Sequence, residues 1–140
     1  MAKNIDKHEE RITLTIYEQF IEVLKEKIGD TVTSAEIKDR LITKFNTKPG
    51  SINPADYCYN RYNKGRAVNK NLFIYINKKT YRYVGENYPY TGLVFHKPKG
   101  TDCESVVGEW DNGKLLVYKD KDKIGISQIK KLYEAYFEML

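Results

Sequence analysis

Residues 72–84, LFIYINKKTYRYV, contain two short runs rich in β-branched and aromatic residues, separated by Asn77-Lys78-Lys79. Runs of this kind on either side of a short polar segment are typical of a β-hairpin. The sequence therefore predicts strands over 72–76 and 80–84, joined by a basic turn. Because a single hairpin is only marginally stable in water, the residues around it must supply partners that bury its apolar side chains.

Three helices are predicted on the N-terminal side of this hairpin. Apolar residues recur every three or four positions over 12–28, which is the period of an amphipathic helix, and Gly29 ends the run. Thr33 is followed three residues later by Glu36, a capping-box signature that begins a second helix. A third helix is predicted over 54–63, because Asn53 can cap it and Pro54 is favoured at the first helical position.

The predicted order over 12–84 is helix, link, helix, turn, helix and hairpin. This order resembles winged-helix modules, a variant of the helix-turn-helix. The resemblance implies DNA binding, with the third helix in the major groove and the hairpin as the wing. Residues 51–65, SINPADYCYNRYNKG, also resemble a pattern in uncharacterised bacterial and phage proteins, some of them associated with restriction systems. That second resemblance implies a DNA-related setting and transfers no catalytic residue.

The C-terminal part is predicted to extend the winged helix with a small antiparallel β element and a C-terminal helix, so the expected fold class is α+β. Strands are predicted over 105–110 and 114–119, because Asp111-Asn112-Gly113 between them is a strong hairpin signal. An amphipathic stripe over 126–140 predicts the final helix, which can pack on the first helix or form a homodimer through a coiled-coil seam. The expected organisation is a flexible N-terminus (1–11), a winged-helix domain (12–84) and a segment packed on it (85–140).

Basic residues are concentrated in the middle of the chain. Residues 40–82 hold ten basic residues against one acidic residue, Asp56, a net charge of +9 within 43 residues. Residues 1–39 carry −3 and residues 83–140 carry −1. A segment with this charge repels itself unless an anion neutralises it, and the commonest intracellular polyanions are nucleic acids and acidic membrane surfaces. The alternative is a solvated, lysine-rich face.

The predicted recognition helix over 54–64 and the basic wing over 77–80 form the expected interface with double-stranded DNA. Asn60 can present an amide donor and acceptor to adenine, and Arg61 can bind guanine or phosphate. On the helical period, Cys58 and Tyr62 face the core. The alternative is that the tyrosines are core residues and that only the lysines contact phosphate. The candidate DNA-binding residues are Lys48, Ser51, Asn53, Tyr57, Asn60, Arg61, Lys64, Arg66, Lys70, Lys78, Lys79 and Arg82.

Catalysis is not expected from this sequence. The carboxylates form no cluster that would hold Mg²⁺, and two cysteines with two histidines are too few for a closed zinc site. A nucleophilic Cys58 or Cys103 would need a nearby base, and only His8 and His96 are available. Because the chain also lacks a glycine-rich phosphate loop, we predict a non-enzymatic protein without a metal or cofactor.

The sequence also bears on location. Its apolar runs are shorter than the roughly 18 residues that a transmembrane helix requires, so we predict no membrane partner. The first eleven residues are charged and lack the apolar centre of a secretory signal. We therefore predict a cytoplasmic protein with free thiols.

Aromatic residues recur over 88–110. Tyr88, Tyr90, Phe95 and Trp110 can form an aromatic-lined pocket for a base or a peptide. The alternative is a small core beneath the second hairpin, since aromatic side chains in a small domain are needed to bury surface area.

Two functional hypotheses follow from the sequence. The first is double-stranded DNA binding in transcription regulation, phage biology or restriction. The second is a protein-binding module, such as a phage-encoded inhibitor of a host nucleic-acid enzyme, because winged helices also bind proteins and a fold does not fix a function.

Overall fold

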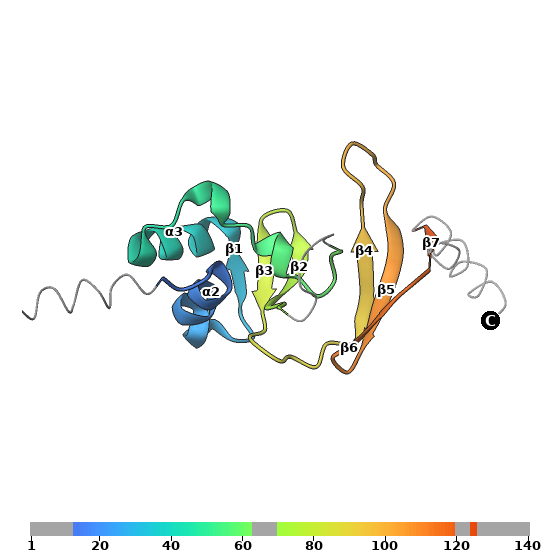
Figure 1. The fold of residues 1–140 in the computed structure, drawn as a ribbon, viewed down its shortest axis with the longest axis horizontal. Helices are drawn as coiled ribbons and strands as arrows, with labels where there is room; N and C mark the ends of the chain where they lie inside the picture. The colour runs from blue at the N-terminus through green and yellow to red at the C-terminus, as the bar shows by residue number, and fades with distance from the viewer. Residues whose placement is uncertain (1–12, 63–69, 120–123, 126–140) are drawn as a thin grey trace, which may run out of the picture.

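A computed structural model describes residues 13–62, 70–119 and 124–125 of the 140-residue chain (Figure 1). In this part of the chain, two α-helices lie beside a first antiparallel sheet, and a second antiparallel sheet lies on the far side of the first (Figure 1). The helices are α2 (Ile16–Leu24) and α3 (Ser34–Phe45). No helix in the described ranges is long and apolar enough to cross a membrane.

The two sheets are formed by different parts of the chain. The first has the strand order β1-β3-β2, and the second has the order β4-β5-β6, with β7 also paired to β5. All named strand pairs are antiparallel. The strands are β1 (Thr31–Thr33), β2 (Phe73–Asn77), β3 (Thr80–Tyr83), β4 (Gly92–His96), β5 (Ser105–Asp111), β6 (Lys114–Val117) and β7 (Ile124–Gly125).

Local capping chemistry sets where the two helices begin. Thr15 and Glu18 form a complete capping box at the start of α2, and the 3-10 turn η1 (Lys25–Lys27) follows this helix. The predicted cap of the second helix is confirmed, because the Thr33 hydroxyl accepts a hydrogen bond from the Glu36 amide at 3.1 Å. The helix ends at Asn46, whose left-handed backbone (φ 55°) is tolerated by asparagine.

Both predicted hairpins are confirmed as β2–β3 and β5–β6. In the second hairpin, Asn112 and Gly113 have φ values of 49° and 84°. Positive φ at both central residues is the requirement of a type I′ turn, which explains why this pair of residues is a strong hairpin signal.

The predicted third helix is wrong, and the winged-helix arrangement is wrong with it. Up to residue 62, where the described part of this region ends, its helical elements are the 3-10 turns η2 (Pro49–Ser51) and η3 (Pro54–Tyr57). Residues 58–62, which we call the linking segment, then form parallel β-bridges, Cys58 with Phe73 and Arg61 with Phe95. The predicted C-terminal helix (126–140) and flexible N-terminus (1–11) lie outside the described residues.

Hydrogen bonds to distant strands explain why the linking segment is not helical. The Tyr59 amide donates to the Phe73 carbonyl and the Tyr62 amide donates to the Phe95 carbonyl, both at 2.9 Å. The Phe95 amide donates in return to the Asn60 carbonyl at 3.0 Å. Tyrosine has only modest helix propensity, so these partners outweigh the local preference that Pro54 and Asn53 suggest.

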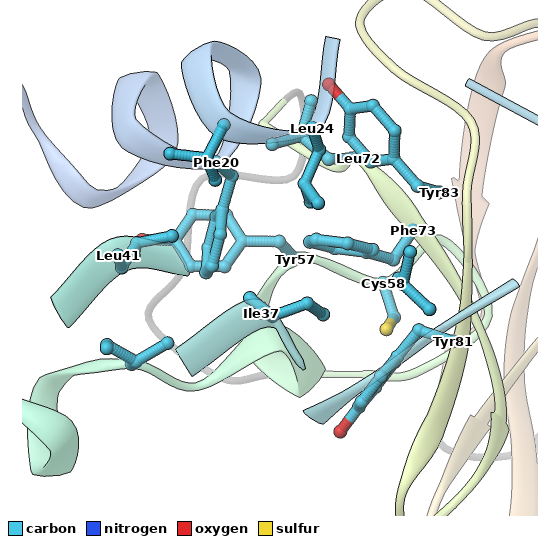
Figure 2. Packing of buried hydrophobic residues seen from close by; sticks show 13 residues of the cluster. Phe20, Leu24, Ile37, Leu41, Tyr57, Cys58, Leu72, Phe73, Tyr81 and Tyr83 are labelled. Atoms are coloured by element: carbon cyan, nitrogen blue, oxygen red, sulfur yellow. The ribbon is translucent and has the colours of Figure 1, made fainter. Parts of the chain in front are cut away.

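The larger hydrophobic core lies between the helices and the first sheet (Figure 2). The rings of Phe20, Tyr57 and Phe73 meet edge to face near its centre, with centroid separations of 5.2 and 5.3 Å from Phe20. Tyr81 and Tyr83 bury their rings in the same cluster and have their hydroxyls at opposite ends of it (Figure 2). Tyr57 is thus a core residue, as the alternative interpretation of the tyrosines expected.

A second core lies against the second sheet. It contains Tyr59, Val84, Val94, Val107 and Trp110, and the Trp110 indole donates a 2.9 Å hydrogen bond to the Tyr59 carbonyl. Tyr59 therefore anchors the second sheet to the linking segment, while the adjacent Tyr57 and Cys58 belong to the first core.

Candidate functional site

The structure separates the predicted DNA-binding residues into three groups. Exposed residues are Lys48, Ser51, Asn53, Lys70, Lys78, Lys79 and Arg82. Tyr57 is buried, and Asn60 and Arg61 are half-buried. Lys64 and Arg66 lie outside the described residues. On the helical period, Cys58 and Tyr62 were expected to face the core and Tyr57 to be exposed. Cys58 is buried as expected. Tyr62 is exposed and Tyr57 is buried, because no α-helix is present there.

Asn60 holds the edge of the first sheet. Its side-chain amide donates to the Tyr75 carbonyl at 2.9 Å, and its side-chain oxygen accepts from the Tyr75 amide at 2.8 Å. These bonds supply Tyr75 with the pair of hydrogen bonds that a neighbouring strand would otherwise provide. The donor and acceptor that sequence analysis offered to adenine are therefore used inside the protein.

Arg61 is also engaged within the protein. Its guanidinium forms a 2.9 Å ion pair with Glu104 and lies 4.7 Å from the centroid of the Tyr75 ring. Glu104 directly precedes β5, 43 positions later in the chain, and its pairing with Arg61 was not predicted. Local sequence carries no signal for a pair at this separation.

Two more cations of the basic middle segment are neutralised by the acidic N-terminal flank. Arg40 pairs with Glu26 and with Glu36 at 3.4 Å, and Lys44 pairs with Glu22 at 3.0 Å. The Arg40 hydrogen bond lowers the pKa of Glu26 below its ordinary value, and the Lys44 hydrogen bond lowers the pKa of Glu22 in the same direction. Arg40, Lys44 and Arg61, three of the ten basic residues over 40–82, therefore have carboxylate partners within the fold.

Among the described residues, the β2–β3 hairpin carries three cations of the basic segment that lack an ion pair, and Lys48 and Lys70 elsewhere also lack one. Lys78 and Lys79 at its turn and Arg82 on β3 are exposed, and none has an ion pair within the described part of the chain. The turn is held in place because the Lys79 amide donates to the Asn77 side chain at 3.0 Å, and the Ser34 amide donates to the Lys79 carbonyl at 2.9 Å. This hairpin, with Lys78, Lys79 and Arg82, is the candidate anion-binding surface.

A concave aromatic site lies beside the turn of the β5–β6 hairpin. The linking segment bonds to Phe95 of β4 toward the opposite end of the same sheet. This pocket, of about 440 Å³, is lined by Tyr59, Asn87, Tyr88, Pro89, Trp110, Asn112, Gly113 and Leu115. Tyr88 and Trp110 were predicted for such a pocket, whereas Tyr90 and Phe95 are not among its lining residues. Tyr59, Asn87 and Asn112 also line the pocket and were not predicted. The alternative of a small core is also correct, since Trp110 is buried in the second core.

The described residues show no arrangement suited to a reactive centre. Burial raises the pKa of the Cys58 thiol far above its ordinary value, so this cysteine is protonated at neutral pH. Cys103 is exposed and free. No group of three or more His, Cys, Asp or Glu side chains within the described ranges could hold a metal ion.

Comparison with known proteins places this fold in a family. Residues 15–117 match the family described as Domain of unknown function (DUF7225). The chain belongs to this family. It is also similar to the Uncharacterized protein YnaC of Bacillus subtilis (strain 168), with 55% identity over 137 residues that cover 91% of this chain and 52% of that protein. The chain thus spans about half the length of this relative. No solved structure matches the present chain.

The DUF7225 match contains both candidate surfaces. It begins at Thr15, the N-cap of α2, and ends at Val117, the last residue of β6. The β2–β3 hairpin, the linking segment and the aromatic pocket all lie within these bounds. Both surfaces therefore lie inside the matched range.

Proposed function

We propose that this DUF7225 domain binds double-stranded DNA without catalysis, through the phosphate backbone and with the β2–β3 hairpin as the contact surface. The observation that carries the proposal is the set of three exposed, unpaired cations on this hairpin: Lys78, Lys79 and Arg82. Other cations of the basic segment, such as Arg40 and Arg61, have carboxylate partners. The backbone that carries these cations is already ordered, so binding to phosphate orders only their side chains.

The proposal is limited to phosphate contacts. Asn60 and Arg61, the expected base readers, already bind Tyr75 and Glu104 within the protein. Contacts to phosphate oxygens set affinity and carry no sequence information directly. Binding of this kind would serve DNA-related processes such as transcription regulation, phage biology or restriction.

The test is a fluorescence-anisotropy titration of a labelled duplex of random sequence at several salt concentrations. We expect a dissociation constant of about 10⁻⁴ to 10⁻⁶ M near physiological salt, weakening steeply as salt increases. The double variant Lys78→Ala/Lys79→Ala should lower the slope of log affinity against log salt by about two. Its effect should be similar for all duplex sequences.

A control with the same change of net charge tests the location of the contact. The double variant Lys97→Ala/Lys99→Ala removes two exposed lysines from the loop between β4 and β5. We expect this variant to keep the salt slope of the unmodified chain. Equal slopes for both double variants would refute contact by the hairpin, and absence of duplex binding at low salt would refute DNA binding altogether.

A second candidate function, a protein-binding module such as a phage-encoded inhibitor, is favoured by three exposed apolar side chains on the second sheet, Leu93, Leu116 and Val117. Leu93 and Leu116 lie on either side of Glu109 in the register of β4, β5 and β6. Leu116 is 57% exposed and Leu93 is 37% exposed. If the protein binds no duplex at low salt, the protein-binding function through this face becomes the hypothesis to test.

A further inference from the structure

The aromatic pocket has walls that are fixed before any ligand binds. Trp110 is held by the hydrogen bond from its indole to the Tyr59 carbonyl, and the Tyr59 ring meets it edge to face with a centroid separation of 5.1 Å. Tyr90 stacks on the other side of Tyr59 at 5.4 Å. A preformed site avoids much of the entropic cost of binding.

The loops at the rim of this pocket are tied to each other. The Gly113 amide donates to the Tyr90 carbonyl at 3.0 Å, and the Asn112 amide donates to the Thr91 hydroxyl at 2.9 Å. The turn of the β5–β6 hairpin is thereby fixed against the residues that precede β4. Tyr88 lies between these fixed elements and leaves 38% of its surface exposed.

Two polar side chains at the rim remain available for a ligand. Asn87 and Asn112 line the pocket, and their side-chain amides make no hydrogen bond within the part of the chain that the structure describes. Each amide offers both a donor and an acceptor. The pocket therefore combines apolar ring surfaces with two groups that can bind a peptide carbonyl or amide.

The absence of charge among the lining residues also favours one class of ligand over another. All eight lining residues are uncharged. A nucleotide would bring its phosphate to a site without a cation among these residues, which makes a nucleic acid a poor occupant. An extended peptide with proline fits better, because proline rings pack on Tyr and Trp, and a polyproline II backbone leaves its carbonyls free for hydrogen bonds.

We propose that the pocket lined by Tyr59, Tyr88 and Trp110 binds an extended, proline-containing peptide, with Asn87 and Asn112 as hydrogen-bond partners of its backbone. This site is separate from the basic hairpin and does not depend on DNA binding. Peptide recognition would give the domain a protein partner in addition to a polyanion.

The experiment is a titration of the full chain with a blocked oligoproline peptide of about ten residues, which forms polyproline II in water. Trp110 is the only tryptophan in the sequence, so its fluorescence reports directly on the pocket. We expect a saturable change in its emission. A flexible Gly/Ser peptide of the same length should produce no saturable change, because its bound conformation is not preformed.

Three variants test whether the signal comes from this pocket. Tyr88→Ala should weaken oligoproline binding about tenfold or more, as expected for an aromatic contact at the centre of a site. Tyr62→Ala is a matched control, because Tyr62 is 39% exposed but contacts His96 away from the pocket. It should bind normally. Asn112→Gly removes one rim amide and suits the positive φ of this position, so it should weaken binding without disturbing the turn.

The outcomes separate the alternatives. Binding that is weakened by both Tyr88→Ala and Asn112→Gly and kept by Tyr62→Ala supports the proposal. Absence of saturable oligoproline binding overturns it, as does equal weakening by Tyr62→Ala. A Trp110 response to oligothymidylate and not to oligoproline would also overturn it, in favour of a nucleic-acid base. The DNA titration on the hairpin variants is read independently, so either proposal can fail alone.

Discussion

Replacing Asn60 with alanine should destabilise the protein by about 2 kcal/mol, since each of its two hydrogen bonds to Tyr75 contributes about 1 kcal/mol net. The bonds are 2.9 and 2.8 Å long and partly buried. Alanine would leave the amide and the carbonyl of Tyr75 without these partners. The loss occurs where β2 is already irregular, because its register with β3 shifts between Tyr75 and Asn77.

The assay is equilibrium unfolding in urea, followed by circular dichroism. With an m-value of about 2 kcal/mol/M, the expected loss lowers the urea midpoint by about 1 M. Asn53→Ala is the matched control, because Asn53 makes a single exposed hydrogen bond to Asp56 at 3.1 Å. We expect it to change stability by less than about 0.5 kcal/mol. A shift for Asn60→Ala no larger than the control's would refute the structural role assigned to Asn60.

Two further predictions concern thiols and phenols. In the native chain, Cys103 should react with a thiol reagent such as DTNB at once, whereas buried Cys58 should react only as the protein opens. Prompt reaction of the one remaining thiol, Cys58, in the Cys103→Ser variant would contradict this burial. Burial raises the pKa of Tyr81 and of Tyr83 from 10.0 to about 12. A raised folded pKa gives stability that is present below pH 10.0 and lost as the pH rises toward about 12, so the urea midpoint should fall over this interval. Tyr83→Phe should reduce that fall, and an unchanged pH dependence would argue against Tyr83 as a source of it.

Sequence signals that act over a few residues predicted local structure well. Thr33 with Glu36 predicted the start of α3, and Asn112 with Gly113 predicted the second hairpin turn. In each case the physical cause lies within four residues of the element it determines. A single sequence contains that information directly.

The recognition helix was mispredicted because its signals were local and the forces that decide the structure are not. Asn53 and Pro54 begin only a 3-10 turn, and the backbone after Tyr57 pairs with Phe73 and Phe95. Tyr57, which was expected to be exposed, is buried, because it ends a 3-10 turn and packs in the first core. The Arg61–Glu104 pair likewise depends on a contact between distant parts of the chain.

The candidate pocket was predictable only in part. Tyr88 and Trp110 were identified by their chemistry, since aromatic side chains in a small β element either form a core or line a site. Tyr59 was missed because it reaches the second sheet from the linking segment. Asn112 was assigned to the turn, and only the fold places its amide at the rim.

The linking segment also protects the protein from aggregation. Among the described strands, β2 and β4 are each the last strand on one side of a sheet. Exposed strand edges can pair with other chains and seed insoluble assemblies. Because Tyr59 bonds to Phe73 and Tyr62 bonds to Phe95, one stretch of five residues covers both edges. Proteolytic cleavage within it would uncover two aggregation-prone edges together, so the segment matters for solubility as much as for stability.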